Sequence, residues 1–215
     1  MSNPTTPASI GPGEFFPVVG VGPHEKPWPE GAHFDPELLL NGDRRNVLDH
    51  YRYWTVEAIV ADLDSKRHKL QIAIENWQHD LNIGSIVRTA NAFNVSGVHI
   101  VGKRDWNKRG AMVTDRYLTV HHHPTVEDFA VWCKENELPI IGIDNVPGSK
   151  QLESAQLPEK CVLLFGQEGA GMSDEGIAVC EVLYEINQYG STRSMNASAA
   201  GAIAMYHWAL QHLPR

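Results

Sequence analysis

The chain has 215 residues, of which 42% are hydrophobic and 20% are charged, as in an ordinary globular domain with a sizeable core. No apolar run reaches the roughly 18 residues that a membrane span needs, and the N-terminus lacks the pattern of a secretory signal. The net charge of −8 argues against a general nucleic-acid coat protein, but it allows a local basic surface. Three widely spaced cysteines predict reduced thiols in a cytoplasmic protein: Cys133, Cys161 and Cys180.

The N-terminal part of the chain is rich in proline and glycine. Eight of the thirteen prolines lie within residues 1–36, so we expect residues 1–43 to be an extended or disordered arm. Residues 44–68 are predicted to form a helical extension, because apolar side chains recur on one helical face from Arg44 to Leu63. We expect no accessory RNA-binding domain before residue 69, only the arm and one helix.

Residues 69–215 alternate short apolar strands with helices. Strands are predicted at 70–74, 97–101, 117–120, 139–143, 161–165 and 182–186. Helices are predicted at 83–93, 126–136 and 196–210. Strands that are separated by helices indicate an α/β fold with a mainly parallel sheet and helices on both faces.

A glycine-rich loop follows the predicted strand 161–165. It runs from Gly166 to Gly171, at the carboxyl edge of the sheet where ligands usually bind. No Gly-Lys-Ser or Gly-Lys-Thr sequence follows, which excludes a P-loop, and the loop lies too late in the chain for a dinucleotide fingerprint. Taken alone, the loop is equally compatible with a tight structural turn.

A second loop contains Gly190 and enters the last helix through Ser194, Met195 and Asn196. Serine and asparagine are typical helix caps, which is the simplest interpretation of this loop. The helix that follows is apolar on nearly every side, so we expect it to be buried in the core or in a subunit interface.

A third segment opens the predicted helix 83–93 with Asn82 and Gly84, and Arg88 follows within that helix. Asn82 can cap the helix, and Gly84 permits the close approach of another segment. An exposed arginine on a helix is usually only solubilising. Each of these residues therefore has a structural explanation when the segment is taken alone.

Together the three segments resemble the three motifs of the SpoU (TrmH) family of SPOUT RNA methyltransferases, in the same order along residues 69–211. The first motif, Asn-x-Gly-x-x-x-Arg-x-Ala, matches residues 82–90. The second, Gly-x-Glu-x-x-Gly, matches residues 166–171, including Glu168. The third ends in Ser-Leu-Asn and corresponds to residues 194–196.

The chain departs from the family pattern at two places. The family often has Ile-Pro-Met before its final loop, whereas this chain has Ile186, Asn187 and Gln188. Met195 replaces the usual leucine, a change that conserves side-chain volume. The two polar residues bear on fine specificity more than on activity.

The resemblance implies a SPOUT fold with a deep C-terminal trefoil knot, and an isologous homodimer that uses the last helix. It also implies S-adenosyl-L-methionine as the cofactor, bent and held by backbone groups of the second and third motifs. Gly190 would permit the turn of the third. The residues that the resemblance assigns to cofactor binding are Gly166, Glu168, Gly171, Ile186, Gly190, Met195 and Asn196.

Members of the family methylate a ribose 2′-hydroxyl of tRNA or ribosomal RNA and require no metal, so the same reaction is implied here. The residues implied in catalysis are Arg88, Asn82, Glu168, Ser194 and Asn196. The family pattern assigns Arg88 to the reacting hydroxyl. Because a guanidinium stays protonated, we assign Arg88 to the adjacent phosphate and the developing alkoxide, and leave the base unassigned.

Residues 82–116 contain six Lys or Arg and only two Asp, a local charge of +4. A solvated charge run is the commoner explanation of such a segment. Given the resemblance, we expect RNA binding by Arg88, Lys103, Arg104, Lys108, Arg109 and Arg116. Trp106 and Tyr117 lie nearby and are candidates to stack on an unpaired base. The run 121–123 is three histidines, which alternate between the faces of a strand and do not predict a metal site.

Two other functions stay open. A non-catalytic RNA-binding or assembly module would keep the fold and lack methyl transfer. A nucleotide-dependent enzyme would use the Gly166 loop, although it lacks an acidic ribose partner at the expected distance. The sequence does not identify the RNA or the modified nucleotide.

Overall fold

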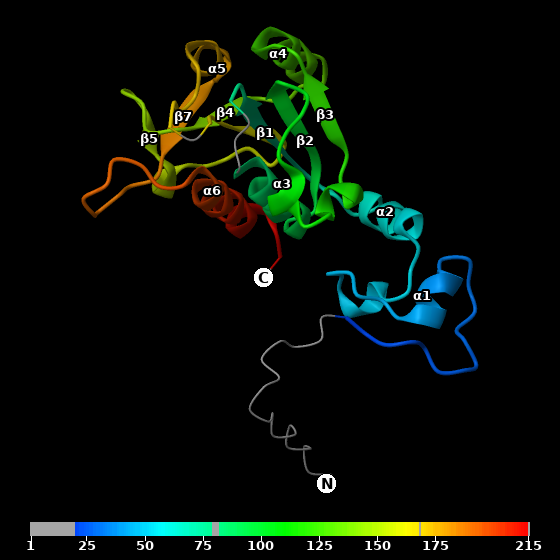
Figure 1. Ribbon diagram of the computed structural model, residues 1–215. Helices are drawn as coiled ribbons and strands as arrows, with labels where there is room; N and C mark the ends of the chain where they lie inside the picture. Colours follow the sequence, from blue (N-terminus) through cyan, green and yellow to red (C-terminus); the bar gives the residue numbers. More distant parts are fainter. Residues whose placement is uncertain (1–19, 79–81, 168, 215) are drawn as a thin grey trace. The chain divides into compact units, whose positions relative to one another are not determined.

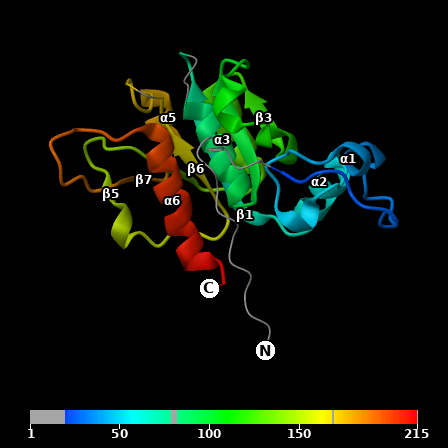
Figure 2. The same ribbon diagram turned by 60° about the horizontal axis from the view of Figure 1, so that its bottom comes forward.

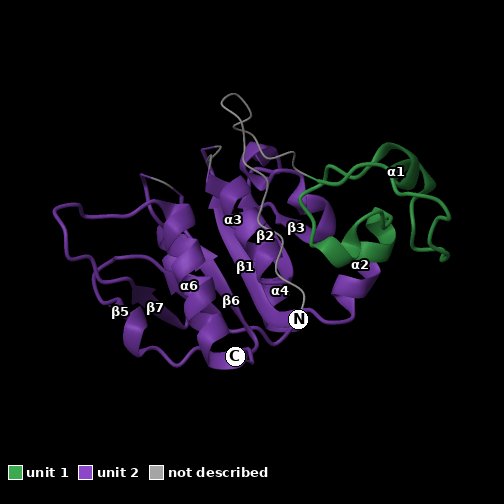
Figure 3. Ribbon diagram, turned by 90° about the horizontal axis from the view of Figure 1, so that it is seen from below, with its two compact units in different colours: residues 1–59 green, residues 60–215 purple. Residues whose placement is uncertain are grey.

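The computed structural model describes residues 20–78, 82–167 and 169–214. The chain divides into two compact units, residues 1–59 and residues 60–215 (Figure 3). Part of the predicted arm and Glu168 lie outside the described residues. No described helix is long and apolar enough to cross a membrane.

The described part of the first unit is organised around the buried carboxylate of Asp43. This carboxylate accepts hydrogen bonds from the backbone N–H groups of Arg45 and Tyr53 (both 3.0 Å) and from the Arg45 guanidinium (2.9 and 2.7 Å). Burial raises the pKa of Asp43, but these hydrogen bonds and the Arg45 charge outweigh burial and hold the pKa below its ordinary value. The Asp43 backbone also pairs with Val21 through two hydrogen bonds of 2.9 Å.

The predicted extended arm is therefore folded where the structure describes it. Helix α1 (Pro36–Asn41) lies within it, capped by Asp35, whose carboxylate accepts hydrogen bonds from two backbone N–H groups. The high glycine and proline content predicted disorder. The buried cluster around Asp43, which orders this segment, has no recognisable pattern in the sequence. Residues 20–43 belong to the first unit.

The single helix predicted from Arg44 to Leu63 is wrong. This range holds a short 3-10 turn, η1 (Asp49–Tyr51), and then helix α2 (Val56–Asp64). The Arg45 guanidinium, which binds Asp43, also donates to the carbonyl of Trp54 (2.8 Å) and so bends the chain between them. The Arg45 guanidinium therefore has a structural role in the first unit.

A seven-stranded sheet forms the centre of the second unit (Figures 1 and 2). The order across it is β3-β2-β1-β6-β4-β7-β5, and all neighbouring strands are parallel. The predicted parallel sheet is confirmed. Its strands are β1 (His68–Asn76), β2 (Val95–Gly102), β3 (Val120–His123), β4 (Ile140–Ile143), β5 (Lys150–Gln151), β6 (Cys161–Phe165) and β7 (Val182–Glu185).

Helices cover both faces of the sheet, as predicted. On one face α3 (Asn82–Ala92) packs beside α6 (Ala197–His212), and on the other α4 (Val126–Glu135) packs beside α5 (Asp174–Val179). Figure 2 shows α3 and α6 side by side over the central strands. The trefoil knot stays a prediction. Short 3-10 turns complete the unit: η2 (Lys108–Ala111), η3 (Thr114–Tyr117) and η4 (Leu152–Ser154).

One predicted strand is displaced. Residues 117–120 were expected to pair in the sheet, whereas β3 begins only at Val120. The 3-10 turn η3 includes Tyr117, and the N–H of Leu118 donates to the carbonyl of Asp115 (3.4 Å), so the strand begins later. The two-residue strand β5 is exposed and has no apolar alternation that predicts it.

Candidate active site

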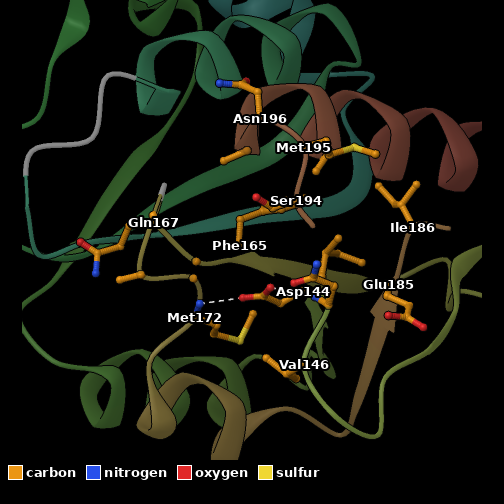
Figure 4. A pocket seen from close by; sticks show the side chains of 18 of the residues that line it. Asp144, Val146, Phe165, Gln167, Met172, Glu185, Ile186, Ser194, Met195 and Asn196 are labelled. Atoms are coloured by element: carbon orange, nitrogen blue, oxygen red, sulfur yellow. Dashed lines mark hydrogen bonds between the residues drawn. The ribbon is translucent and has the colours of Figure 1, made fainter. Parts of the chain in front are cut away.

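A cavity of about 390 Å³ opens at the carboxyl edge of the sheet, where β4, β6 and β7 end (Figure 4). The loops that follow these strands form its walls, and the first turn of α6 contributes Ala197 and Ala200. The second and third motifs therefore meet in one place. The predicted residues in the cavity wall are Gly166, Gly171, Ile186, Ser194, Met195 and Asn196.

The glycine-rich loop after β6 is closed by its own backbone. Gln167 and Gly171 exchange two hydrogen bonds of 3.1 and 3.0 Å. A Cβ atom on Gly166 would lie 2.2 Å from the nitrogen of Met172, so only glycine fits there. Gly171 has a left-handed backbone (φ +74°) that favours glycine. The simpler explanation of a tight turn is thus correct, and the same turn forms a wall of the cavity.

The end of β4 anchors both cavity loops, which the sequence did not predict. Asp144 Oδ2 accepts a hydrogen bond of 2.7 Å from the Met172 N–H, just after the glycine loop (Figure 4). Asn145 Nδ2 donates to the carbonyl of Arg193 (2.5 Å), and Gln188 Nε2 donates to the same carbonyl (3.1 Å). The only sequence signal was the position of Asp144 and Asn145 at the carboxyl end of a parallel strand.

Asn196 connects the third motif with the first. Its Oδ1 caps α6 by accepting hydrogen bonds from the N–H groups of Ser198 (3.0 Å) and Ala199 (3.3 Å). Its Nδ2 donates to Oδ1 of Asn82 (2.8 Å), at the start of α3. Because Asn196 also lines the cavity, this hydrogen bond fixes the start of α3 to the cavity wall.

The cavity wall is acidic. Asp144 and Glu185 line it, and no Lys, Arg or His among the described residues does. Neither carboxylate takes part in an ion pair within the described parts of the chain. Unpaired negative charge attracts a cationic ligand and disfavours the phosphates of a nucleotide.

Gly84 of the first motif brings residues 103–116, the basic segment, against α3. A Cβ atom on Gly84 would lie 2.8 Å from backbone atoms of Asn107, Gly110 and Ala111, and one on Gly110 would lie 2.8 Å from the nitrogen of Ser85. Two glycines therefore permit this close backbone approach. The basic side chains of the segment are exposed: Lys103, Arg104, Lys108, Arg109 and Arg116.

Arg88 is exposed on α3 and does not line the cavity of the single chain. It lies six residues after Asn82, which corresponds to about 9 Å along an α-helix. The structure thus brings Asn82 to the cavity and leaves Arg88 on the surface nearby.

Four other predicted residues either differ from expectation or lie outside the described residues. Gly190 does not line the cavity, has no left-handed φ, and would have nothing within 4 Å of an added Cβ atom. Tyr117 is only 5% exposed, so the prediction that it stacks on a base is wrong. Trp106 is half-buried and packs on the core. Glu168 lies outside the described residues.

A histidine network lies away from the cavity, between β2, β3 and α4. His99 Nε2 is 2.6 Å from Gln71 Oε1, and His99 Nδ1 is 2.9 Å from His123 Nε2. Trp132 covers His99, with 4.5 Å between ring centroids. Burial, helped by the charges of His121 and His123, lowers the pKa of His99 to about 2. Within the described ranges, no group of three or more His, Cys, Asp or Glu side chains is placed to hold a metal.

The three cysteines are free, as predicted. Cys133 and Cys161 are buried, whereas Cys180 is half-buried. Burial raises the pKa of each thiol to about 12, and the Glu75 charge contributes at Cys180. The thiols are therefore protonated near neutral pH and are poor nucleophiles.

Comparison with known protein families decides the assignment. The model of the SpoU rRNA Methylase family matches residues 69–206, more than half of the chain. The chain belongs to this family. All three motifs fall within the SpoU match, so the resemblance drawn from them is confirmed.

Individual relatives are distant. The tRNA (guanosine(18)-2'-O)-methyltransferase of Borreliella burgdorferi is 25% identical over 147 residues, which cover 67% of each chain. The crystal structure of the SpoU methyltransferase AviRb from Streptomyces viridochromogenes has a TM-score of 0.63 and 24% identity, covering 71% of this chain and 63% of that one. The TrmH/SpoU tRNA modifying enzyme of A. aeolicus has a TM-score of 0.64 and 21% identity, covering 73% and 81%. These likenesses show the SPOUT methyltransferase fold.

Proposed function

We propose that this protein uses S-adenosyl-L-methionine to methylate a ribose 2′-hydroxyl of tRNA or ribosomal RNA. The observation that carries the proposal is the hydrogen bond between Asn82 and Asn196, which joins the first motif to the cavity formed by the other two. Membership of the SpoU family supports the reaction type. The name of the Borreliella relative supports a tRNA substrate.

The negative charge of the cavity and the backbone and apolar groups that line it suit this cofactor. When bound, S-adenosyl-L-methionine supplies a methyl group on a positively charged sulfur. Asp144 and Glu185 attract that charge, and they argue against a nucleotide that carries phosphates. The loops present backbone and apolar groups for the rest of the molecule, at Gly166, Gly171, Ile186, Met195 and Asn196.

Arg88 and the basic segment would act on the RNA. Arg88 binds the phosphate beside the target ribose and stabilises negative charge that develops on the attacking oxygen. Asn82 and Asn196 hold the start of α3, and Ser194 and Glu168 belong to the loops that position the reactants. The residues proposed to bind the RNA backbone are Lys103, Arg104, Lys108, Arg109 and Arg116. The residue that accepts the proton is unassigned.

The proposal includes a homodimer that forms through α6. One side of this helix is buried in the core at Met205 and Trp208. The other side exposes three large apolar residues one turn apart, Ile203, Tyr206 and Leu210, at 42, 57 and 44%. A stripe of this kind is typical of a subunit interface. A cytoplasmic location, where the free thiols would stay reduced, belongs to the same proposal.

Two measurements test the function. Calorimetry of the whole protein is expected to detect binding of S-adenosylhomocysteine in the low micromolar range and no binding of NAD. Arg88→Ala is expected to abolish methyl transfer to unmodified tRNA transcripts while it leaves cofactor affinity within about twofold, because Arg88 does not line the cavity. Full activity of Arg88→Ala would remove its catalytic role, and cofactor binding without transfer by the wild type would favour the non-catalytic module.

A further inference from the structure

An apolar tip projects from the basic segment, and the proposed reaction gives it no role. Met112 is 59% exposed and Val113 is 53% exposed, between the turns η2 and η3. The residues on either side, Ala111 and Thr114, are buried, and the hydrogen bond between them closes the base of the tip. The backbone on both sides of the tip is therefore held in place, while the two apolar side chains stay exposed.

The backbone of this tip is strained. Met112 has φ +49° and Val113 has φ +67°, both in the left-handed region. A β-branched residue is a marked outlier there, because its Cβ atom crowds the backbone. Burial does not offset the strain, since both side chains are exposed. Strain of this kind is often found at binding sites, where the surrounding structure imposes it.

The charges around the tip indicate what it contacts. Lys108, Arg109 and Arg116 are exposed within four residues of it, and only Lys108 is engaged with the single nearby carboxylate, Asp115 (3.0 Å). Positive groups around an apolar tip match a nucleic acid, in which phosphates flank an apolar base. Apolar side chains, methionine included, pack against base faces in other protein–nucleic acid complexes.

We propose that Met112 and Val113 pack against an unpaired base of the bound RNA while Arg109 and Arg116 bind the flanking phosphates. The tip would then distinguish RNA that has accessible base faces from fully paired RNA, in which the base faces are stacked. This inference rests on the proposed function in so far as the ligand is RNA. It assigns to the tip a recognition role that is separate from methyl transfer.

Val113→Asn gives the sharpest test, because asparagine tolerates a left-handed φ but is polar. Relief of strain is expected to raise Tm by roughly 3 °C. The same variant is expected to bind an unmodified tRNA transcript about fivefold more weakly, and a fully paired RNA duplex of about 20 base pairs within twofold of wild type. If Val113 had only a structural role, its substitution would not raise Tm and weaken tRNA binding together.

Arg109→Ala is the matched control within the same segment. It removes a phosphate contact, so it is expected to weaken binding of the tRNA and of the duplex alike, and to lower the salt dependence of both. Val113→Gly serves as a second variant that relieves strain and removes the apolar side chain. Wild-type affinity of both Val113 variants for the tRNA would overturn the tip's role while leaving the proposed function intact. Absence of any RNA binding by the wild type would overturn both.

Discussion

At the scale of single residues, Asn196 has two roles that substitutions can separate. Asn196→Ala removes the cap of α6 and the hydrogen bond to Asn82, so we expect unfolding to become easier by about 1 kcal/mol or more. Serine also caps helices but is too short to reach Asn82. Asn196→Ser should therefore keep most of the stability and lose cofactor affinity and methyl transfer. Thermal melting and calorimetry check this, and an active Asn196→Ser would contradict the role of the hydrogen bond.

Asp144 combines a hydrogen bond with a negative charge in the cavity. Asp144→Asn keeps an oxygen that accepts the Met172 N–H but removes the charge. We expect affinity for S-adenosylmethionine to fall about fivefold and affinity for neutral S-adenosylhomocysteine to change less than twofold, because only the former carries the sulfonium charge. Calorimetry with both ligands measures the ratio.

Glu159→Gln is the matched control for this charge change. Glu159 precedes β6 at the opposite, amino edge of the sheet and forms a surface ion pair with Lys69. Its substitution should leave both affinities unchanged. An equal effect of Asp144→Asn on both ligands would mean that the cavity charge does not select the cation.

The sequence predicted residues that bear a pattern and missed those that do not. Gly166, Asn82 and Asn196 were found because the motifs specify their types and spacing. Asp144 and Asn145 escaped because they follow a short buried strand with no motif around them. The expectation that the turn at position 190 requires glycine was wrong, because a Cβ atom there would meet nothing within 4 Å.

At the scale of elements, the central strands were predictable because burial on both faces makes them continuous apolar runs. Strand β6, apolar and buried along its whole length, shows this directly. The helix predicted from Arg44 to Leu63 failed for the opposite reason: a polar cluster around Asp43 overrides the apolar period. Tertiary hydrogen bonds of this type leave no periodic signal in a sequence.

The histidine network between β2, β3 and α4 predicts a dependence of stability on pH. The pKa of His99 is about 2 in the folded chain and 6.5 as its ordinary value. Below pH 6.5 the unfolded chain therefore binds a proton that the folded chain does not, and stability falls as the pH falls. Well below pH 6.5 the expected slope is about 1.4 kcal/mol per pH unit for His99, and it vanishes well above that pH.

Burial lowers the pKa of His121 and His123 as well, so both add to the slope in the same direction. Denaturant unfolding between pH 6.5 and 5 measures it. His99→Asn should reduce the slope by up to about 1.4 kcal/mol per pH unit, whatever its effect on stability at pH 7. An unchanged slope would show that His99 titrates normally in the folded chain.

At the scale of the whole molecule, the exposed stripe on α6 predicts association. Tyr206 lies at its centre and is 57% exposed. Tyr206→Asp would place a charge in an apolar interface, so we expect sedimentation to show a dimer for the wild type and a monomer for the variant. Glu181→Gln, an exposed residue just before β7, is a control that should remain dimeric. A monomeric wild type would contradict this part of the proposal.

The atom that receives the methyl group distinguishes ribose methylation from base methylation. The direct measurement is to incubate the purified protein with unmodified tRNA or ribosomal RNA and S-adenosylmethionine, digest the RNA to nucleosides and locate the added mass by fragmentation. We expect a methyl group on the ribose, in a product resistant to alkaline hydrolysis at that nucleotide and absent with Arg88→Ala. A methyl group on the base would contradict this expectation.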